Sequence, residues 1–469
     1  MDDAAGATAT GRPPAVEAAR SSQLIRSWCM YNWASHGWFT PVAAVLAGPW
    51  MLALADHAVG DHGILIALGP LRLRAAAFPS AMITVAAVVQ LVALPVFGAR
   101  ADARGAKRRW LAAACTAGAV VSGLLAVTSG GAWAAAGVLF VAGSLFAGVS
   151  ELTWNGMLPE LAEPSDRDRV SSLGSAVGYL GGGILLAIDL VVVDLHAELG
   201  LTKSVAVRLC FALAALWWLG WGWPSLRRLD TPGRVPVLGA LAEAPSRAWT
   251  TLRATRRTLN SMPHARRFVL AYLLFADAVS AVLSLASTFL THELFHNNTT
   301  SATPFLFELI LMIQFVALGG ALLFGRLARR YGAPRALIAS LLLWIGLIVY
   351  SWAGLTTQLD AVITGFGMGI ALGGTGALSR SVFAQMIPLG AEATWFGIYE
   401  VCSQGTAWVA PLLFTIVVNT TGSFRQAILS LVVLFVAGTA VLFFVDAGRA
   451  AAEAAAVTGP AAPPASRPR

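Results

Sequence analysis

The chain has 469 residues, of which 57% are hydrophobic and only 12% are charged. A soluble domain carries about 25% charged residues, so half that share over this length argues against a soluble enzyme and indicates a polytopic membrane protein. The formal net charge of +8 would suit a nucleic-acid-binding protein, but the distribution of the charges along the chain argues against nucleic acid, as described below.

The apolar residues fall into twelve long runs. A hydrocarbon core of about 30 Å requires a helix of about 20 apolar residues, which each run can form. In chain order the runs are 28–53, 78–99, 110–129, 132–157, 171–193, 205–223, 267–291, 305–325, 336–354, 358–380, 394–419 and 425–446. We therefore expect an all-α polytopic membrane protein with twelve transmembrane helices.

Lysine and arginine residues gather on alternate connections between these runs. With the N-terminus inside, 27 of the 32 basic residues lie on the inner side. The other five are Arg72, Arg74, Lys203, Arg208 and Arg425. By the positive-inside rule we expect both termini in the cytoplasm and an integral protein of the plasma or inner membrane. This topology explains the net positive charge without nucleic acid.

Polar segments divide the twelve runs into two sets of six. The longest connection, residues 224–265, is rich in arginine and follows the sixth run. The expected organisation is a disordered cytoplasmic tail (1–22), an N-terminal six-helix half (23–223), a cytoplasmic basic linker (224–265), a C-terminal six-helix half (266–448) and a second disordered cytoplasmic tail (449–469).

Two short motifs recur at nearly the same offset. GARADARGAKR begins at Gly98, and GRLARRYGAPR begins 227 residues later at Gly325. MLPE at 157–160 is matched by MIPL at 386–389, an offset of 229. Two matches at about half the chain length indicate two parallel six-helix halves, which is the architecture of secondary transporters of the Major Facilitator type.

The first of these motifs resembles the loop that is characteristic of the Major Facilitator Superfamily. The matching residues are Gly98, Asp102, Gly105 and Lys107. Ala103 replaces the usual arginine after the aspartate, although Arg104 follows it, and Arg329 replaces the aspartate in the second copy. The resemblance implies a gating role, in which the loop locks helix two to helix eleven in one access state. The alternative is an ordinary solvated basic turn.

A narrower resemblance covers most of the chain. The segments YNWASHG, LPELAEPSDRDRVSSLGSAVGYLGGG, GALSRSVFAQMIPLGAEATWFGIYE and VDAGRA resemble the vacuole-effluxer (autophagy-related) branch and its bacterial relatives. That branch is associated with export of small solutes, notably amino acids. The chain departs from it where Asn32 replaces aspartate, Ser35 replaces asparagine, and Glu400 and Gln404 replace asparagine and lysine.

Ionisable residues within membrane helices are rare and mark transport pathways or structural pairs. Asp277, near the middle of the seventh run, is the strongest candidate for a substrate or proton site. Glu400 and Gln404 lie one turn apart in the eleventh run, so we place them in the same pathway. The alternative for Glu400 is an inner-gate salt bridge with Arg380. Another pair one turn apart is Glu151 and Asn155, for which gating is the expected role.

The first run opens with SWCMYNWASHGWF. On a helix, Asn32, Ser35, His36 and Thr40 form one polar stripe. We expect this stripe, together with Tyr31, to face a central cavity as part of the substrate or proton pathway. The alternative is hydrogen bonding between helices alone. Since Asn32 carries no charge, His36 is the titratable group of this stripe.

Metal and cofactor chemistry have little support. The four cysteines, Cys29, Cys115, Cys210 and Cys402, lie inside apolar runs without CxxC spacing. The densest cluster of possible metal ligands is DHAVGDH, with Asp56, His57, Asp61 and His62, in an outer connection without further partners. No GxxxxGK[ST] nucleotide motif occurs. We expect no metal and no cofactor.

These observations favour a secondary active transporter that exports a small solute, with an amino acid as the candidate, by alternating access. The alternatives are efflux of amphipathic drugs or lipids, and an embedded enzyme or a non-transporting sensor on the same fold. We expect a monomer in the lipid bilayer that is not an enzyme. Its partner is a small-molecule substrate, and protons are the candidate coupling ion.

Overall fold

The computed structural model describes residues 14–60, 63–68, 71–103, 107–229, 245–295, 299–388, 390–405 and 409–458. The N-terminal half contains α1 (Pro14–Gly37), a π-helical segment η1 (Trp38–Leu46), α2 (Ala47–Val59), α3 (Phe78–Ala103), α4 (Lys107–Leu125), α5 (Trp133–Leu161), α6 (Arg167–Asp194) and α7 (Lys203–Arg228). The C-terminal half contains α10 (Pro263–Phe295), α11 (Thr299–Tyr331), α12 (Ala333–Gly354), α13 (Gln358–Ala384), α14 (Glu392–Gly405), α15 (Val409–Thr421), α16 (Phe424–Ser430) and α17 (Val432–Phe443).

All twelve expected spans coincide with helical segments. Within the described residues, ten helices are long and apolar enough to cross a membrane, and Val409–Val418 is a shorter apolar helix. The two further spans are α4, which begins with three basic residues, and the eleventh, which is divided between α14 and α15. The predicted all-α membrane architecture is confirmed.

Two spans are interrupted in ways that the hydrophobic pattern did not indicate. The first changes from α-helix to π-helix at Trp38, and Pro41 lies within the π-helical segment, where its missing N–H removes one helical hydrogen bond. The twelfth passes from α16 to α17 at Leu431.

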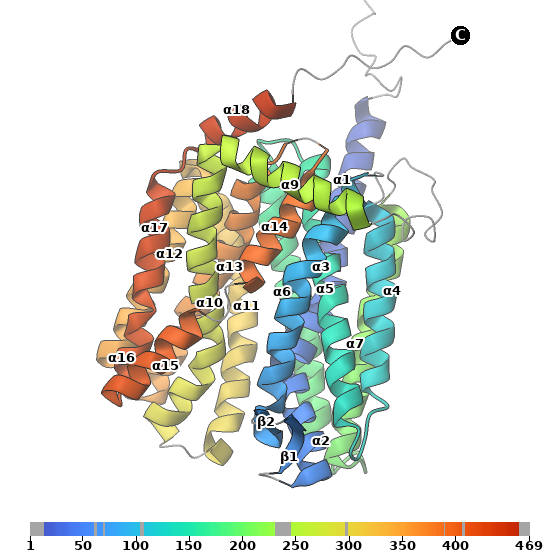
Figure 1. The fold of residues 1–469 in the computed structure, drawn as a ribbon, viewed down its shortest axis with the longest axis vertical. Helices are drawn as coiled ribbons and strands as arrows, with labels where there is room; N and C mark the ends of the chain where they lie inside the picture. The colour runs from blue at the N-terminus through green and yellow to red at the C-terminus, as the bar shows by residue number, and fades with distance from the viewer. Residues whose placement is uncertain are drawn as a thin grey trace, which may run out of the picture.

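The connection after the first span contains a structure that was not predicted. Strand β1 (Ile64–Leu68) pairs antiparallel with β2 (Leu71–Arg74), and the short 3-10 helix η2 (Ala75–Ala77) leads from this hairpin into α3. Figure 1 places this hairpin beside α2, at the opposite end of the bundle from α9 and α18. We call these the hairpin end and the terminal end.

Helical structure extends into segments that were expected to be disordered or irregular. Helix α1 begins at Pro14, inside the expected N-terminal tail, and α18 (Ala447–Thr458) covers the start of the expected C-terminal tail. The alanine-rich sequence of α18 explains this difference, because alanine has the highest helix propensity and Ala450 and Ala454 are buried. In the linker, α9 (Pro245–Ser261) lies across the terminal end (Figure 1).

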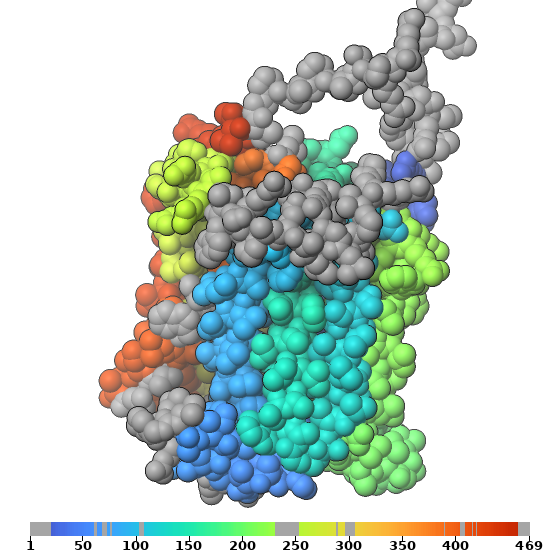
Figure 2. Space-filling model, turned by 45° about the vertical axis from the view of Figure 1, so that its right-hand side comes forward, coloured from blue at the N-terminus to red at the C-terminus, as the bar shows by residue number. Residues whose placement is uncertain are grey.

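The two halves stand side by side, and close helix contacts join them. Helix α3 packs on α14, α5 packs on α14, and α6 packs on α11 and α13. Gly98 allows the first of these contacts, because a Cβ atom there would collide with the carbonyl oxygen of Ala393. In Figure 2, α3, α4, α5 and α7 form a continuous wall over one side of the N-terminal half. This packing brings polar side chains of α5, α13 and α14 together.

Candidate functional site

A cluster of four polar side chains joins the two halves. Glu151 and Asn155 come from α5, Arg380 from α13 and Glu400 from α14. The Nη2 atom of Arg380 lies 3.3 Å from Glu151 Oε1. Asn155 Nδ2 donates to Glu400 Oε1 at 3.2 Å and to Glu151 Oε1 at 3.3 Å. We call these four residues the central cluster.

The ion pair of the central cluster joins equivalent positions of the two repeats. Arg380 follows Glu151 by 229 residues, which is the offset between MLPE and MIPL. The same offset relates Ser150 to Ser379 and Trp154 to Phe383. In a protein built from two parallel repeats, equivalent residues can touch only near the pseudo-two-fold axis. The Glu151–Arg380 pair therefore marks the centre of the interface between the halves.

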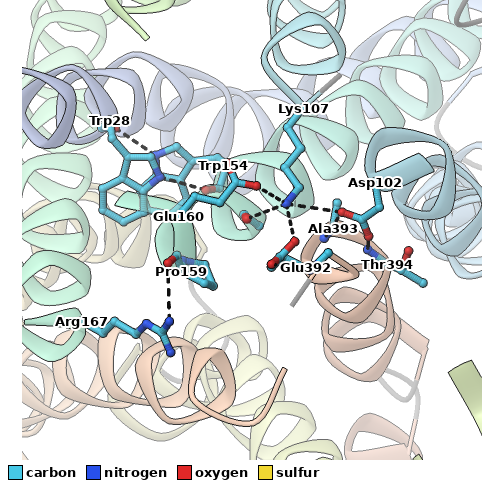
Figure 3. Close-up of polar contacts among 12 residues, drawn as sticks. Trp28, Asp102, Lys107, Trp154, Pro159, Glu160, Arg167, Glu392, Ala393 and Thr394 are labelled. Carbon is cyan, nitrogen blue, oxygen red and sulfur yellow. Dashed lines mark hydrogen bonds and ion pairs between the residues drawn. The ribbon is translucent and has the colours of Figure 1, made fainter. Parts of the chain in front are cut away.

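Arg380 reaches from the C-terminal half into a pocket built by the N-terminal half. Its guanidinium lies 4.4 Å from the ring centre of Trp154, and its Nη1 atom donates to Ser175 Oγ at 3.1 Å. Trp154 in turn stacks on Trp28 of α1 with ring centres 4.0 Å apart. Each indole N–H donates to the other residue's carbonyl oxygen, at 2.8 and 2.9 Å (Figure 3). The stack fixes the position of the guanidinium.

The central cluster has unused hydrogen-bonding capacity. Arg380 Nε and Asn155 Oδ1 are buried and have no hydrogen-bond partner among the described residues. Aromatic side chains pack beside Glu400, where Tyr399 stacks on Tyr272 with ring centres 4.0 Å apart. A buried donor without a partner is costly, so a ligand that accepts a hydrogen bond from Arg380 would gain affinity.

The alternative interpretation of Glu400, a salt bridge with Arg380, is not what this structure shows. Arg380 forms its ion pair with Glu151, whereas Glu400 accepts a hydrogen bond from Asn155. The reason is the insertion of Arg380 between α5 and α6, where Trp154 and Ser175 hold it. The side chain of Gln404 lies outside the described residues, so its predicted place beside Glu400 stays a prediction.

The polar residues of the first helix divide into two groups. Tyr31 Oη lies 2.8 Å from Ser150 Oγ, Asn32 donates to the carbonyl of Gly174 at 2.9 Å, and Ser35 donates to the carbonyl of Asn32 at 3.3 Å. All three are buried within the N-terminal half. This is the alternative arrangement, hydrogen bonding between and within helices, and not the expected cavity lining.

The deeper part of the same stripe lies closer to the interface between the halves. Gln314 of α11 donates to Thr40 Oγ1 at 2.7 Å and so bridges the halves. His36 packs edge-on against Tyr179 at 5.4 Å, and both lie within electrostatic reach of Arg380. His36 Nδ1 is buried without a partner among the described residues. His36 is therefore the titratable residue of this stripe, and its environment includes Arg380 of the central cluster.

Asp277 of α10 contacts the second part of the eleventh span. It is 2% exposed, and its Oδ2 atom accepts the backbone N–H of Ala410 in α15 at 2.9 Å. Oδ1 has no partner among the described residues. Asp277 thus has a structural contact within the C-terminal half, and its predicted proton role stays a prediction.

A second charged network closes the terminal end (Figure 3). Asp102 of α3 accepts the backbone N–H groups of Ala393, at 2.9 Å, and of Thr394 in the first turn of α14. Lys107 Nζ contacts Asp102 at 3.4 Å, Glu392 at 2.7 Å, and Glu160. Burial alone would lower the pKa of Lys107, but the three carboxylates outweigh it and the pKa is raised. We call Asp102, Lys107, Glu160 and Glu392 the terminal-end network.

The structure describes three of the five residues predicted to gate in the GARADARGAKR loop. Gly98, Asp102 and Lys107 meet the C-terminal half, whereas Arg104 and Gly105 lie outside the described residues. The sequence reasoning missed Glu160 and Glu392 as partners of Lys107. The repeat could have drawn attention to Glu392, because Glu392 and Glu163 occupy equivalent positions after MIPL and MLPE.

Contacts of α6 with α13 add to the closure of the terminal end. Arg167 Nη1 donates to the carbonyl of Ala384 at 3.0 Å. Ser171 Oγ donates to the carbonyl of Ala377 at 2.8 Å, and Ser381 donates to Asp168. Sequence analysis did not single out these residues. They connect the halves between the central cluster and the terminal end.

Only part of the DHAVGDH segment, the candidate metal cluster, lies within the described residues. Asp56 and His57 lie in the last turns of α2, and Asp61 and His62 fall outside the described residues. Within the described part of the chain, no group of three or more His, Cys, Asp or Glu side chains could hold a metal ion. The four cysteines are buried, and none of them forms a disulfide.

Comparisons with known proteins agree with this architecture. The family described as "Vacuole effluxer Atg22 like" matches residues 20–455. An uncharacterised MFS-type transporter of Bacillus subtilis, YxiO, is 22% identical over 91% of this chain and 95% of its own length. Autophagy-related protein 22-1 of Aspergillus fumigatus is 25% identical over 62% of this chain, which spans half of that longer protein.

Solved structures show the same fold at low sequence identity. The fucose:proton symporter of E. coli superposes with a TM-score of 0.65 and 12% identity, over 91% of this chain and 98% of its own. The proton:xylose symporter XylE gives a TM-score of 0.65 and 14% identity, over 91% and 97%. Together with the family match over nearly the whole chain, these likenesses mean that the chain belongs to the Atg22-like vacuole effluxer family and has the Major Facilitator fold.

Proposed function

We propose that this protein is a secondary active transporter that moves a small solute by alternating access, with the central cluster at the middle of its pathway. The supporting observation is the Glu151–Arg380 ion pair, which joins equivalent positions of the two repeats. Sites of parallel-repeat transporters lie near the bilayer midplane between the halves. Glu151 and Arg380 must separate when one half rocks against the other, so a solute bound between them would affect that movement.

The basic connections support a cytoplasmic position for the terminal end. The contacts of the terminal-end network and of α6 with α13 then close the cytoplasmic side. In this state the solute would leave toward the outside, which is the step that an exporter requires. Export and the cell-membrane location are parts of the proposal.

The chemistry of the central cluster suits a zwitterion such as an amino acid. Arg380 can bind a carboxylate through two parallel hydrogen bonds. Glu151 and Glu400 can bind an ammonium group, and Asn155 already links the two carboxylates. Tyr272 and Tyr399 provide an aromatic wall beside them. A compact ligand with one charge of each sign would satisfy both parts of the cluster.

Proton coupling fits the same charge balance. One guanidinium faces two carboxylates, the buried Glu400 and the partly buried Glu151, and an unpaired carboxylate in a low-dielectric interior is costly. A proton on Glu400 would remove that cost, so Glu400 is the first candidate for the coupling site. Asp277 and His36, named from the sequence, are the second and third.

Flux into vesicles tests the proposal. Purified protein in proteoliposomes should exchange labelled amino acids against unlabelled ones, and hydrophobic cations should not compete. Dominant competition by hydrophobic cations would support the drug-efflux alternative instead. In inverted vesicles, a pH gradient should drive uptake by the unaltered protein.

Three variants then separate the coupling sites. Glu400→Gln should retain exchange but lose the dependence on the pH gradient, and Asp277→Asn tests the second site in the same way. Glu308→Gln is the matched control, since Glu308 is exposed in α11 and has the same side chain. If both Glu400→Gln and Asp277→Asn transport and couple normally, the assignment of proton coupling to these two carboxylates is wrong.

A further inference from the structure

A groove between α1 and α7 lies apart from the site described above. Its volume is about 990 Å³. The lining residues are Ser22, Gln23, Arg26, Ser27, Met30, Leu216, Gly220, Trp221, Pro224, Ser225 and Arg228. Helix α7 packs against α1, α4 and α6 of its own half. Because Leu216 is 68% exposed, this side of α7 faces the lipid of the bilayer.

The groove is polar and basic at one end, where Arg26 and Arg228 lie, and apolar toward Met30 and Leu216. Arg26 and Arg228 line it, and no acidic side chain does. Among the described residues, neither guanidinium has a hydrogen bond or an ion pair. The neighbouring Arg227 differs, because it does not line the groove and its guanidinium lies 5.6 Å from the ring centre of Trp223. Two positive charges therefore converge on the groove without a described counter-charge.

The apolar part follows a single stripe of α7. Leu216, Gly220, Pro224 and Arg228 recur every four residues, so they share one face of the helix. From Arg228 to Leu216 this stripe is about 18 Å long, slightly more than the ~15 Å hydrocarbon depth of one leaflet. A Cβ atom at Gly220 would meet nothing within 4 Å, so the middle of the stripe is open.

We propose that this groove binds one anionic phospholipid from the leaflet at the terminal end. Its phosphodiester lies between Arg26 and Arg228, and one acyl chain follows the stripe past Gly220 to Leu216. Arginine matches the geometry of phosphate oxygens, and basic pockets between membrane helices bind anionic headgroups. The half-exposed Trp221 then lies at headgroup level, where tryptophan is enriched.

Native mass spectrometry of the full chain tests this proposal with defined lipids. Added phosphatidylglycerol should remain bound as one molecule per protein at energies that remove phosphatidylcholine. Arg26→Gln with Arg228→Gln should weaken retention of phosphatidylglycerol at least tenfold. Arg227→Gln with Arg253→Gln removes the same charge at exposed positions that do not line the groove, and should leave retention unchanged.

A second variant tests the acyl-chain part without altering charge. Gly220→Phe fills open space, so folding and melting temperature in detergent should be unchanged. It should weaken phosphatidylglycerol binding several-fold and leave any binding of glycerol 3-phosphate intact. The measurement with glycerol 3-phosphate distinguishes a groove that binds a lipid from one that binds a soluble phosphate compound.

Three results would overturn the proposal. In the first, the unaltered protein retains phosphatidylglycerol and phosphatidylcholine equally. In the second, both double arginine variants weaken retention of phosphatidylglycerol to the same extent. In the third, glycerol 3-phosphate binds the groove as tightly as phosphatidylglycerol does. The last result would indicate a soluble phosphate ligand. None of these measurements depends on transport, so the proposed function can fail independently.

Discussion

The central cluster and the terminal-end network both join the two halves through charged side chains, but they differ in how completely those side chains are paired. In the terminal-end network, Lys107 contacts three carboxylates, and Asp102 also accepts two backbone N–H groups. In the central cluster, Arg380 Nε and Asn155 Oδ1 lack partners among the described residues. A network that is fully paired suits a closed gate, whereas unused donors and acceptors suit a site that accepts a ligand.

The largest expected effect breaks the central ion pair and then restores it. Arg380→Glu places a third carboxylate beside Glu151 and Glu400 and should lower exchange at least 100-fold, since an unpaired buried charge costs about 3–5 kcal/mol. Because the two positions are equivalent in the repeats, adding Glu151→Arg should recover much of the activity. Exchange in proteoliposomes measures both variants.

The charge-swapped protein also tests whether the pair is a gate or only a binding contact. Recovery of exchange with altered substrate preference supports a contact with substrate. Recovery without any change in preference would restrict the pair to gating, and no recovery at all would contradict the equivalence of the two positions.

The next effect concerns the terminal-end network. Asp102→Asn weakens the cap on α14 and removes one carboxylate from Lys107, so it should cost about 1–2 kcal/mol in the state closed at this end. The ratio of closed to open molecules should fall about tenfold. Spin labels at the exposed positions Glu163 and Arg266, one in each half, would report this shift by pulsed distance measurement.

Asp166→Asn is the matched control for that experiment. Asp166 is exposed and pairs with Arg169 within its own helix turn, so its loss should not alter the distance. A distance distribution that stays the same in Asp102→Asn would show that the network does not hold this end closed.

A smaller effect is expected in the first helix. Asn32→Ala leaves the Gly174 carbonyl without its side-chain donor and should lower stability by about 1–2 kcal/mol, with no change in substrate preference. Thermal melting and exchange assays measure the two quantities. Thr40→Val provides the contrast, since it removes the acceptor of the Gln314 bond between the halves and should slow exchange. A changed substrate preference in Asn32→Ala would support the predicted role of Asn32 in the substrate pathway.

The smallest expected effect is a pH dependence of the stability that Lys107 contributes. The pKa of Lys107 is raised in the folded protein, so its stabilising contribution is complete below the ordinary lysine pKa of about 10.4 and is lost as the pH rises through the higher folded value. The unaltered protein should therefore lose melting temperature above about pH 10.5 more steeply than Lys107→Gln. Parallel curves for the two proteins would contradict this.

Much of the fold could be predicted from the sequence, and particular residues show where prediction ended. The repeat of Gly98 at Gly325 indicated two parallel halves. The family resemblance implied that the loop of Asp102 contacts helix eleven, and in the structure Asp102 accepts the backbone N–H of Ala393 in α14. Sequence also selected Glu151 with Asn155 as one pair, and Glu400 with Arg380 as its alternative partner. It did not predict that they form one cluster, because a helical pattern defines which face a residue lies on but not which helix that face meets.

Tyr31, Asn32 and Ser35 illustrate the same limit in the opposite direction. Spacing placed Asn32 and Ser35 on one polar stripe, and Tyr31 was expected in the same pathway, but Asn32 bonds to α6 and Tyr31 to α5 of the same half. Glycines at 174 and 178 allow this close approach, since a Cβ atom at Gly178 would collide with the side chains of Asn32 and His36. Polarity alone cannot distinguish a cavity-facing residue from one that is satisfied by a neighbouring backbone carbonyl.

The sequence by itself determined the membrane class, the positions of the spans and the two-half organisation, because burial in a bilayer depends on the length and hydrophobicity of local segments. The tertiary structure alone decided the change to π-helix at Trp38, the insertion of Arg380 between α5 and α6, and its pairing with Glu151 rather than Glu400. The contacts of Arg380 with Trp154 and Glu151 join residues more than 200 positions apart, so their energies are set by packing geometry and are not encoded in any single segment.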